Sequence, residues 1–317
     1  MHRTATCHVI GTALLAAGCA GPAWHHVHDA DAPLVGGIYD VETREALDED
    51  RLLARLSAAD FVLLGEKHDN VDHHRLQARV VRRLGERGEV RAVVFEMMGT
   101  DRQAAIDAHL RRRLDDAEGL GEALDWSDSG WPAWELYRPI AREALNAGAA
   151  IVGGNLPEDR VMAVATNGAE ALPDALAERT GLDRPLTDVQ DAALRRELID
   201  AHCGHVPGAT YLDDMASVQR ARDASMADSM VGAAGEGATI LIAGTGHVRT
   251  DRGVPLYLRR LTPGRESVSL ALLEAPEGEA LPDDLPYDFV WFTPSSDPPG
   301  FDPCDTFREQ LERMHDG

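Results

Sequence analysis

The chain has 317 residues, of which 44% are hydrophobic and only 5% are aromatic, so it is long enough to bury one large core or two modest ones. Its formal charge is −23, and a surface that acidic repels nucleic acid and anionic lipid, which argues against either as an electrostatic partner. After residue 20 no segment approaches the ~20 apolar residues that a membrane-spanning helix needs.

The first residues are typical of an export signal. Residues 9–17 are mostly small and apolar, and the stretch 15–19 resembles a lipobox that ends in Cys19. We therefore expect residues 1–18 to be a lipoprotein signal peptide, Cys19 to carry lipid, and residues 19–36 to form a tether. The alternative is an ordinary secretory signal that is cleaved nearby. In both cases the sequence predicts a protein of the cell envelope, and with lipid on Cys19 it is anchored to a membrane facing the periplasm.

Four short apolar runs, separated by segments with helical periodicity, predict buried strands of a mostly parallel sheet. They cover residues 61–64, 92–95, 149–153 and 239–243. Between the third and fourth runs, helical patterns fill residues 157–235, which predicts a smaller inserted helical subdomain. The α/β domain then comprises residues 37–156 and 236–317, with late strands at 267–273 and 288–292 at a sheet edge and a helix near 305–314.

Polar residues follow three of these strands. Parallel neighbours end at one edge of a sheet, where ligands of open α/β folds bind, so we expect five side chains to share a cleft: Glu66, His68, His74, Glu96 and His247. Carboxylates and imidazoles suit acid–base chemistry and also a divalent metal. The spacing is not that of an HExxH zinc helix. The alternative is a buried hydrogen-bonding network that fixes the strand ends.

A second group of polar residues lies in the predicted helical insertion. His202, Cys203 and His205 end a helix, and Tyr211 follows shortly after. Cys203 is either a reactive thiolate between two histidines or a small buried residue. Because Cys7 lies in the signal and Cys19 takes lipid, Cys203 and Cys304 are left to form a disulfide if their Cα atoms lie close enough.

The chain resembles haem-binding lipoproteins of the ChaN family, in the Tiki and erythromycin-esterase superfamily. The motifs that carry the resemblance run in order through residues 37–275: Gly65-Glu66-x-His68-Asp69-Asn70 with His73-His74, Glu96-Met97, Trp131-x-x-Trp134-x-x-Tyr137, His202-Cys203-Gly204-His205-x-Pro207, Gln219-x-x-Arg222-Asp223-x-x-Met226-Ala227, and Gly244-x-Gly246-His247-Val248 with Gly253-Val254-Pro255. The resemblance implies an α/β domain with a smaller helical domain, a homodimer, haem as the ligand, and a role with an outer-membrane haem-uptake system. Other branches of the superfamily hydrolyse lactones or resemble metal-dependent proteases.

Two functions follow from these observations. In the first, the exported lipoprotein binds haem for iron uptake, with an iron ligand from Tyr211, Tyr137, His202 or His205 and with Arg222 near the propionates. We expect Tyr211 to be that ligand. In the second, the cleft is a hydrolase with Glu66 or Glu96 as its base and with a divalent metal held by Glu66, His68 and His247, or by His74 together with these histidines.

Overall fold

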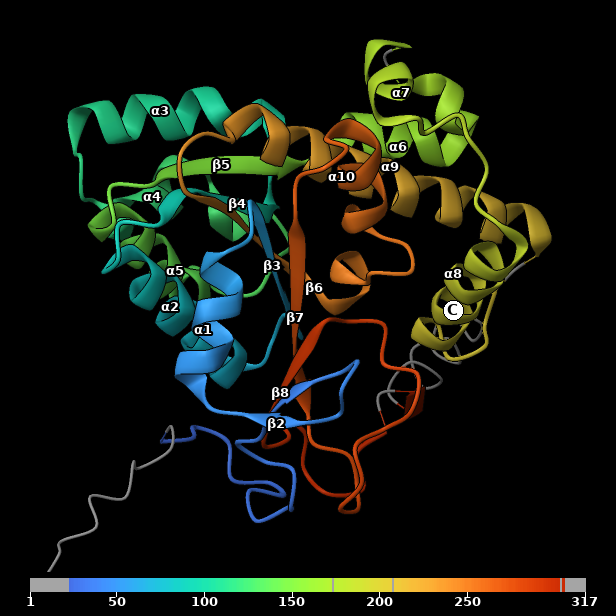
Figure 1. Cartoon of the computed structure of the whole chain (residues 1–317). Helices are drawn as coiled ribbons and strands as arrows, with labels where there is room; N and C mark the ends of the chain where they lie inside the picture. Colours follow the sequence, from blue (N-terminus) through green and yellow to red (C-terminus); the bar gives the residue numbers. More distant parts are fainter. Residues whose placement is uncertain (1–22, 173, 207, 303, 306–317) are drawn as a thin grey trace, which may run out of the picture.

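The computed structural model describes residues 23–172, 174–206, 208–302 and 304–305. The signal-peptide prediction and Cys19 lie outside these residues, as does nearly all of the helix expected near 305–314. Within them one eight-stranded sheet has the order β2-β1-β8-β7-β3-β6-β4-β5 (Figure 1). The strands are β1 (Ile38–Asp40), β2 (Ala46–Leu47), β3 (Phe61–Glu66), β4 (Val90–Gly99), β5 (Ala150–Asn155), β6 (Ala238–Gly244), β7 (Ser267–Glu274) and β8 (Phe289–Thr293).

The sheet is mostly parallel, as the sequence predicts. Every pairing from β8 through β5 is parallel, and only β1 runs antiparallel to its neighbours β2 and β8. The late strands are not at an edge, which corrects the prediction: β7 pairs with β3 and β8 lies between β7 and β1. After β6 the chain crosses over β3 through the helix at Val254–Leu261 and continues into β7 on the other side of β3. The edge strands of the sheet are β2 and β5.

Helices cover both faces of this sheet (Figure 1). They are α1 (Glu49–Ser57), α2 (Val71–Gly85), α3 (Gln103–Arg112), α4 (Ala117–Ala123), α5 (Trp134–Asn146), α6 (Glu158–Asn167), α7 (Asp174–Thr180), α8 (Asp188–Ala201), α9 (Ala209–Ala233) and α10 (Val254–Leu261), with short 3₁₀ turns η1 (Thr100–Arg102), η2 (Trp126–Asp128), η3 (Ala169–Ala171) and η4 (Thr245–Val248). None of the helices within the described residues is both long and apolar enough to cross a bilayer.

The continuous apolar runs arise because successive side chains of a strand point to opposite, equally buried faces. In β3, Val62 and Leu64 pack into the core formed with α1, α2 and α5. Phe61 and Leu63 pack into a second core with α9 and α10. Each face removes apolar surface from water, which is the main favourable term in folding. Met226 and Met230 of α9 belong to this second core rather than to a surface.

The helices between β5 and β6 are α6 to α9. Figure 1 shows α7 and α8 at the side of the sheet, while α9 runs back along it. Residues 23–36, expected to be a tether, are folded onto the body where the structure describes them. Trp24 packs against the first core, and the backbone N–H groups of His25 and His26 donate to the carboxylate of Asp72 at 2.7 and 2.9 Å.

Candidate functional site

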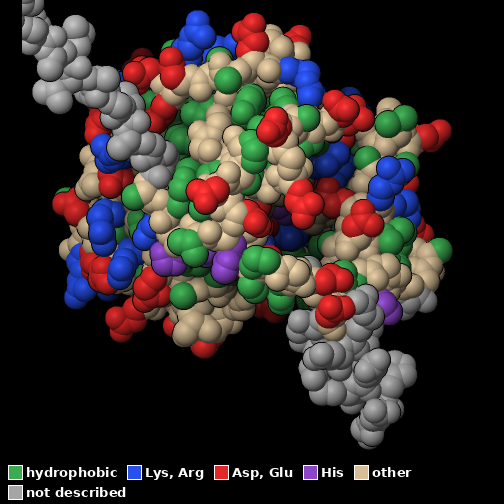
Figure 2. Space-filling model, turned by 90° about the horizontal axis from the view of Figure 1, so that it is seen from below, with side chains coloured by type: hydrophobic (Ala, Val, Ile, Leu, Met, Phe, Trp, Pro, Cys, Tyr) green, Lys and Arg blue, Asp and Glu red, His purple; other side chains and the backbone are tan. Residues whose placement is uncertain are grey.

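The carboxyl ends of β3, β6 and β4 bring together all five residues predicted for the cleft. β6 lies between β3 and β4, and Glu66 of β3 pairs across the ladder with Gly244 of β6. Glu96 of β4 reaches the same point, since its Oε2 accepts the backbone N–H of Gly244 at 2.7 Å. Figure 2 views the molecule from this end, and the hollow near its centre carries acidic and basic side chains together.

Glu66 is held by two histidines and a tyrosine. Its carboxylate lies 2.9 Å from Nδ1 of His68 and 2.8 Å from Nδ1 of His74, and the hydroxyl of Tyr137 donates to it at 3.3 Å. Burial alone would raise the pKa of Glu66, but His74 and His68 hold it below its usual value. The same contacts raise the pKa values of both histidines against the opposing effect of burial. Glu66 is therefore an ionised anchor for two imidazoles.

Glu96 forms the second half of the cluster. Arg222 donates to its Oε1 at 2.5 Å, and Nε2 of His247 lies 3.2 Å from the same oxygen. On its other side His247 places Nδ1 2.6 Å from Oδ1 of buried Asp223. Although burial opposes its charge, the carboxylates of Glu96 and Asp223 raise the pKa of His247 to about 9. Glu96 itself has a pKa well below its usual range because His247 and Arg222 outweigh its burial.

His68 is the member of the cluster that is open to a ligand. Its side chain is 34% exposed, whereas those of His74 and His247 are 2% and 4% exposed. Glu66 fixes Nδ1, which leaves Nε2 directed toward the cleft at 3.9 Å from Glu96. The ring of Trp131 packs edge-on against it at 5.0 Å. An imidazole oriented by a carboxylate in this way can take or give a proton.

Buried His73, next to His74 on α2, is a neutral histidine that packs beside this cluster. The backbone N–H of Lys67 donates to Nδ1 of His73 at 2.9 Å, so its Nε2 is the protonated nitrogen and donates to Thr293 at 3.0 Å. Burial lowers the pKa of His73 to about 3. Asn70 caps α2 and accepts from the N–H groups of Asp72 and His73, which fixes the start of the helix that carries His74.

The cluster also includes residues that were predicted to have another role or were assigned none. Asp223 follows Arg222 in the motif that begins at Gln219, but no role was predicted for it. Its position one helical turn after Gln219 is the only sequence signal that could have indicated its contact with His247. Arg222 was expected near haem propionates, yet it binds Glu96 and Asn155. Tyr137 was a candidate iron ligand, yet it is fully buried on α5 against Glu66, and burial raises its pKa.

The other predicted residues lie apart from the cluster. Tyr211 is in the first turn of α9 and 47% exposed. His202 and His205 are in the turn between α8 and α9, where each ring contacts a backbone carbonyl. Cys203 is bonded to Cys304, with Cα atoms 5.4 Å apart, which confirms the possible disulfide and removes the reactive thiolate.

The described part of the chain has no ready set of ligands for the predicted metal. Among the residues that it describes, no three His, Cys, Asp or Glu side chains are grouped so as to hold an ion. The physical reason lies in the carboxylates, because Glu96 already accepts from Arg222 and Gly244, and Glu66 is occupied by His68, His74 and Tyr137. In the predicted set of Glu66, His68 and His247, only Nε2 of His68 is therefore left open, and one ligand atom does not make a metal site.

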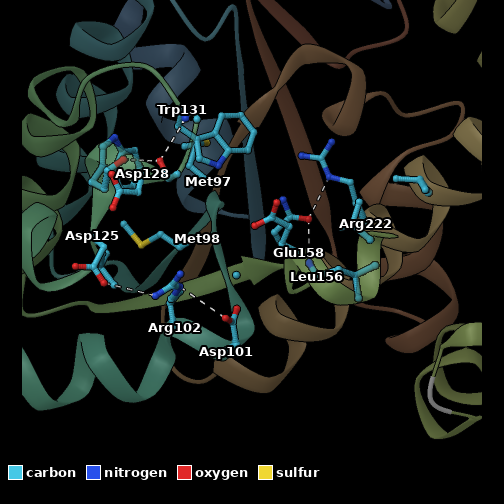
Figure 3. Close-up of a pocket in the computed structure, with 18 residues that line it drawn as sticks. Met97, Met98, Asp101, Arg102, Asp125, Asp128, Trp131, Leu156, Glu158 and Arg222 are labelled. Carbon is cyan, nitrogen blue, oxygen red and sulfur yellow. Dashed lines mark hydrogen bonds and ion pairs between the residues drawn. The ribbon is translucent and has the colours of Figure 1, made fainter. Parts of the chain in front are cut away.

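A cavity of about 640 Å³ opens next to the cluster, and Arg222 and Trp131 form part of its wall. Figure 3 shows Trp131 and Met97 on one side of it and Glu158 and Arg222 on the other. Its volume lies in the range of pockets that bind small organic molecules, roughly 300–1,000 Å³.

Comparison with known proteins identifies the family. Residues 52–258 match the family described as "Haem-binding uptake, Tiki superfamily, ChaN". The chain belongs to this family. No protein with a curated description matches it at a significant level.

Two solved structures are similar to this chain to different degrees. ChaN of Campylobacter jejuni, described with cofacial haem binding, is 22% identical over 80% of this chain and 95% of its own, with a TM-score of 0.65, so it shares the fold. The erythromycin esterase EreC is 18% identical over 77% of this chain and 78% of its own, at a TM-score of 0.37. The predicted fold and family are thus confirmed.

Proposed function

We propose that this ChaN-family protein binds haem and serves haem or iron uptake at the cell envelope. The match of residues 52–258 to a haem-binding uptake family carries the proposal. The proposal also includes export by a signal peptide at residues 1–18 and a lipid anchor on Cys19. The protein would act as a homodimer that delivers haem to or from an outer-membrane uptake system. These further parts rest on the sequence and on the resemblance to the family.

The exposure of the tyrosines supports Tyr211 as the iron ligand. A haem ligand must reach a bound porphyrin, and Tyr137 and Tyr257 are fully buried, with pKa values raised by burial. Tyr211 is 47% exposed, and the Cys203–Cys304 disulfide brings the segment with exposed Phe301 to the turn that precedes α9. An exposed phenol can reach the iron of a ferric porphyrin, and His202 and His205 in the turn before α9 are the other candidate ligands on this side of the molecule.

Replacing Tyr211 with phenylalanine is expected to weaken hemin binding by at least about tenfold and to remove the tyrosinate band from the visible spectrum, because the iron loses its oxygen ligand. The measurement is a hemin titration of both proteins. Tyr39→Phe is the matched control, since Tyr39 lies on β1 and packs on Phe292. Equal affinity and spectrum for Tyr211→Phe and the wild type would exclude Tyr211 as the ligand.

We infer a hydrolase as the second candidate, because the Glu66–His68 pair leaves one imidazole nitrogen open to the cleft. The geometry favours His68 as the proton-transfer group over Glu66 or Glu96, whose oxygens are already engaged. Glu66 then orients the ring. The cleft would act on an ester or lactone, where His68 activates water.

For a hydrolase of this kind, His68→Ala is expected to lower the rate of hydrolysis of an activated ester, such as p-nitrophenyl acetate, by about a hundredfold or more. His202→Ala, a half-buried histidine in the turn after α8, should leave the rate unchanged. A wild-type rate that is no greater than that of His68→Ala would remove the support for hydrolysis.

A further inference from the structure

The cavity beside the cluster has a lining that neither the haem proposal nor the Glu66–His68 pair explains. It lies between the end of β4, the turns around η1 and η2, the start of α6 and the middle of α9. Four separate segments of the chain thus form its walls. Its open middle is visible in Figure 3 between Trp131 and Glu158.

Its base is apolar and aromatic. Met97 and Met98 at the end of β4 are 4% and 2% exposed, and Trp126 is 6% exposed. Trp131 is half-buried and presents its indole to the cavity. Indole rings bind flat rings and attract cations through their faces, and thioethers make favourable contacts with aromatic edges.

Its rim is acidic. Four carboxylates line the cavity, Asp101, Asp125, Asp128 and Glu158, against two guanidinium groups. Arg102 lies 3.6 Å from Asp101 and 4.0 Å from Asp125. Arg222 is already paired with buried Glu96. No basic side chain in the described part of the chain forms an ion pair with Asp128 or Glu158.

We propose that this cavity is a binding site for a flat aromatic cation. The indole and methionine surface takes the ring system, and the carboxylates of Asp128 and Glu158 stabilise its positive charge. A dianionic porphyrin would meet an excess of carboxylates here, so the site is separate from the haem surface around Tyr211. Because Trp131 also packs against His68, a bound ring lies beside the open imidazole of the cluster.

The test is the binding of proflavine, a tricyclic cation, to the whole protein, followed by fluorescence anisotropy. The anion fluorescein, which also has three fused rings, is the probe of opposite charge. We expect saturable binding of proflavine and none of fluorescein. The double variant Asp128→Asn and Glu158→Gln should weaken proflavine binding by about fivefold to tenfold, since two charges at the exposed rim are lost. Both side chains are exposed, so folding is retained.

Two further variants separate a local effect from the charge of the whole protein. Glu42→Gln with Glu45→Gln makes the same change of charge at exposed positions around the β1–β2 turn, at the opposite side of the sheet, and should leave affinity within about twofold. Arg102→Gln frees Asp101 and Asp125 and should tighten proflavine binding a few-fold.

Three results would overturn the proposal. They are the absence of saturable proflavine binding, equal binding of fluorescein, and an Arg102→Gln variant that binds proflavine more weakly than the wild type. None of them bears on hemin binding, which is measured separately.

Discussion

Replacing Glu96 with alanine is expected to lower the free energy of unfolding by about 3–5 kcal/mol. Glu96 is 1% exposed and is the shared acceptor for Arg222, the N–H of Gly244 and protonated His247. Its removal takes the shared carboxylate from buried His247, from half-buried Arg222 and from the N–H of Gly244, which costs far more than the loss of one surface ion pair, although Asp223 and Asn155 remain as partners of the two cations. Urea denaturation at neutral pH measures the difference.

The matched control is Glu118→Ala. Glu118 also pairs with arginines, Arg138 and Arg142, but its side chain is 66% exposed, so the loss should be about 0–1 kcal/mol. Glu96→Gln is the milder variant, since its amide oxygen still accepts from Gly244 without neutralising Arg222, and it should fall between these values. A loss below about 1 kcal/mol for Glu96→Ala would contradict the network described here.

The stability of the wild-type protein should fall as pH rises from about 6.5 to 9, and His247 should account for most of the change. Its pKa is raised from 6.5 to about 9 by Glu96 and Asp223 despite burial. A group whose folded pKa is raised contributes stability below its unfolded pKa, and that contribution is lost as pH rises through the folded value. The shift corresponds to on the order of 3 kcal/mol.

Denaturation of the wild type and His247→Gln across this pH range tests the assignment. The variant starts less stable at pH 6, and its profile is flatter toward pH 9. His68 and His74, whose pKa values are also raised, leave a residual slope. On the acid side, the lowered pKa of His73 makes stability fall below about pH 6.5 in both proteins, and the lowered pKa values of Glu66 and Glu96 add to the fall at lower pH. Equal alkaline slopes in the two proteins would show that His247 does not hold its proton as inferred.

The cleft could be predicted from the sequence because parallel topology fixes where strand ends lie. Once the runs before Glu66, Glu96 and Gly244 are assigned to parallel strands, their next residues must meet at one edge. The structure brings these ends together with β6 in the centre. The ChaN resemblance rested on the same residues and is confirmed over residues 52–258.

What the sequence could not provide depends on contacts between distant segments. The place of β7 between β3 and β8 follows from a crossover whose direction no local pattern encodes. Asp223 becomes a partner of His247 only because α9 packs across the end of β6. The Cys203–Cys304 pair spans 101 residues, so spacing alone could not show it. The backbone of His25 and His26 is likewise held by Asp72 of α2, a residue distant from them in the sequence.

Haem binding is the central claim, and a hemin titration of the purified wild-type protein, followed by visible spectroscopy, tests it most directly. The account predicts a saturable shift of the Soret band with a defined stoichiometry and a tyrosinate-type spectrum. A titration that rises linearly with hemin, as it does for a nonspecific protein of equal charge, would contradict the proposed function.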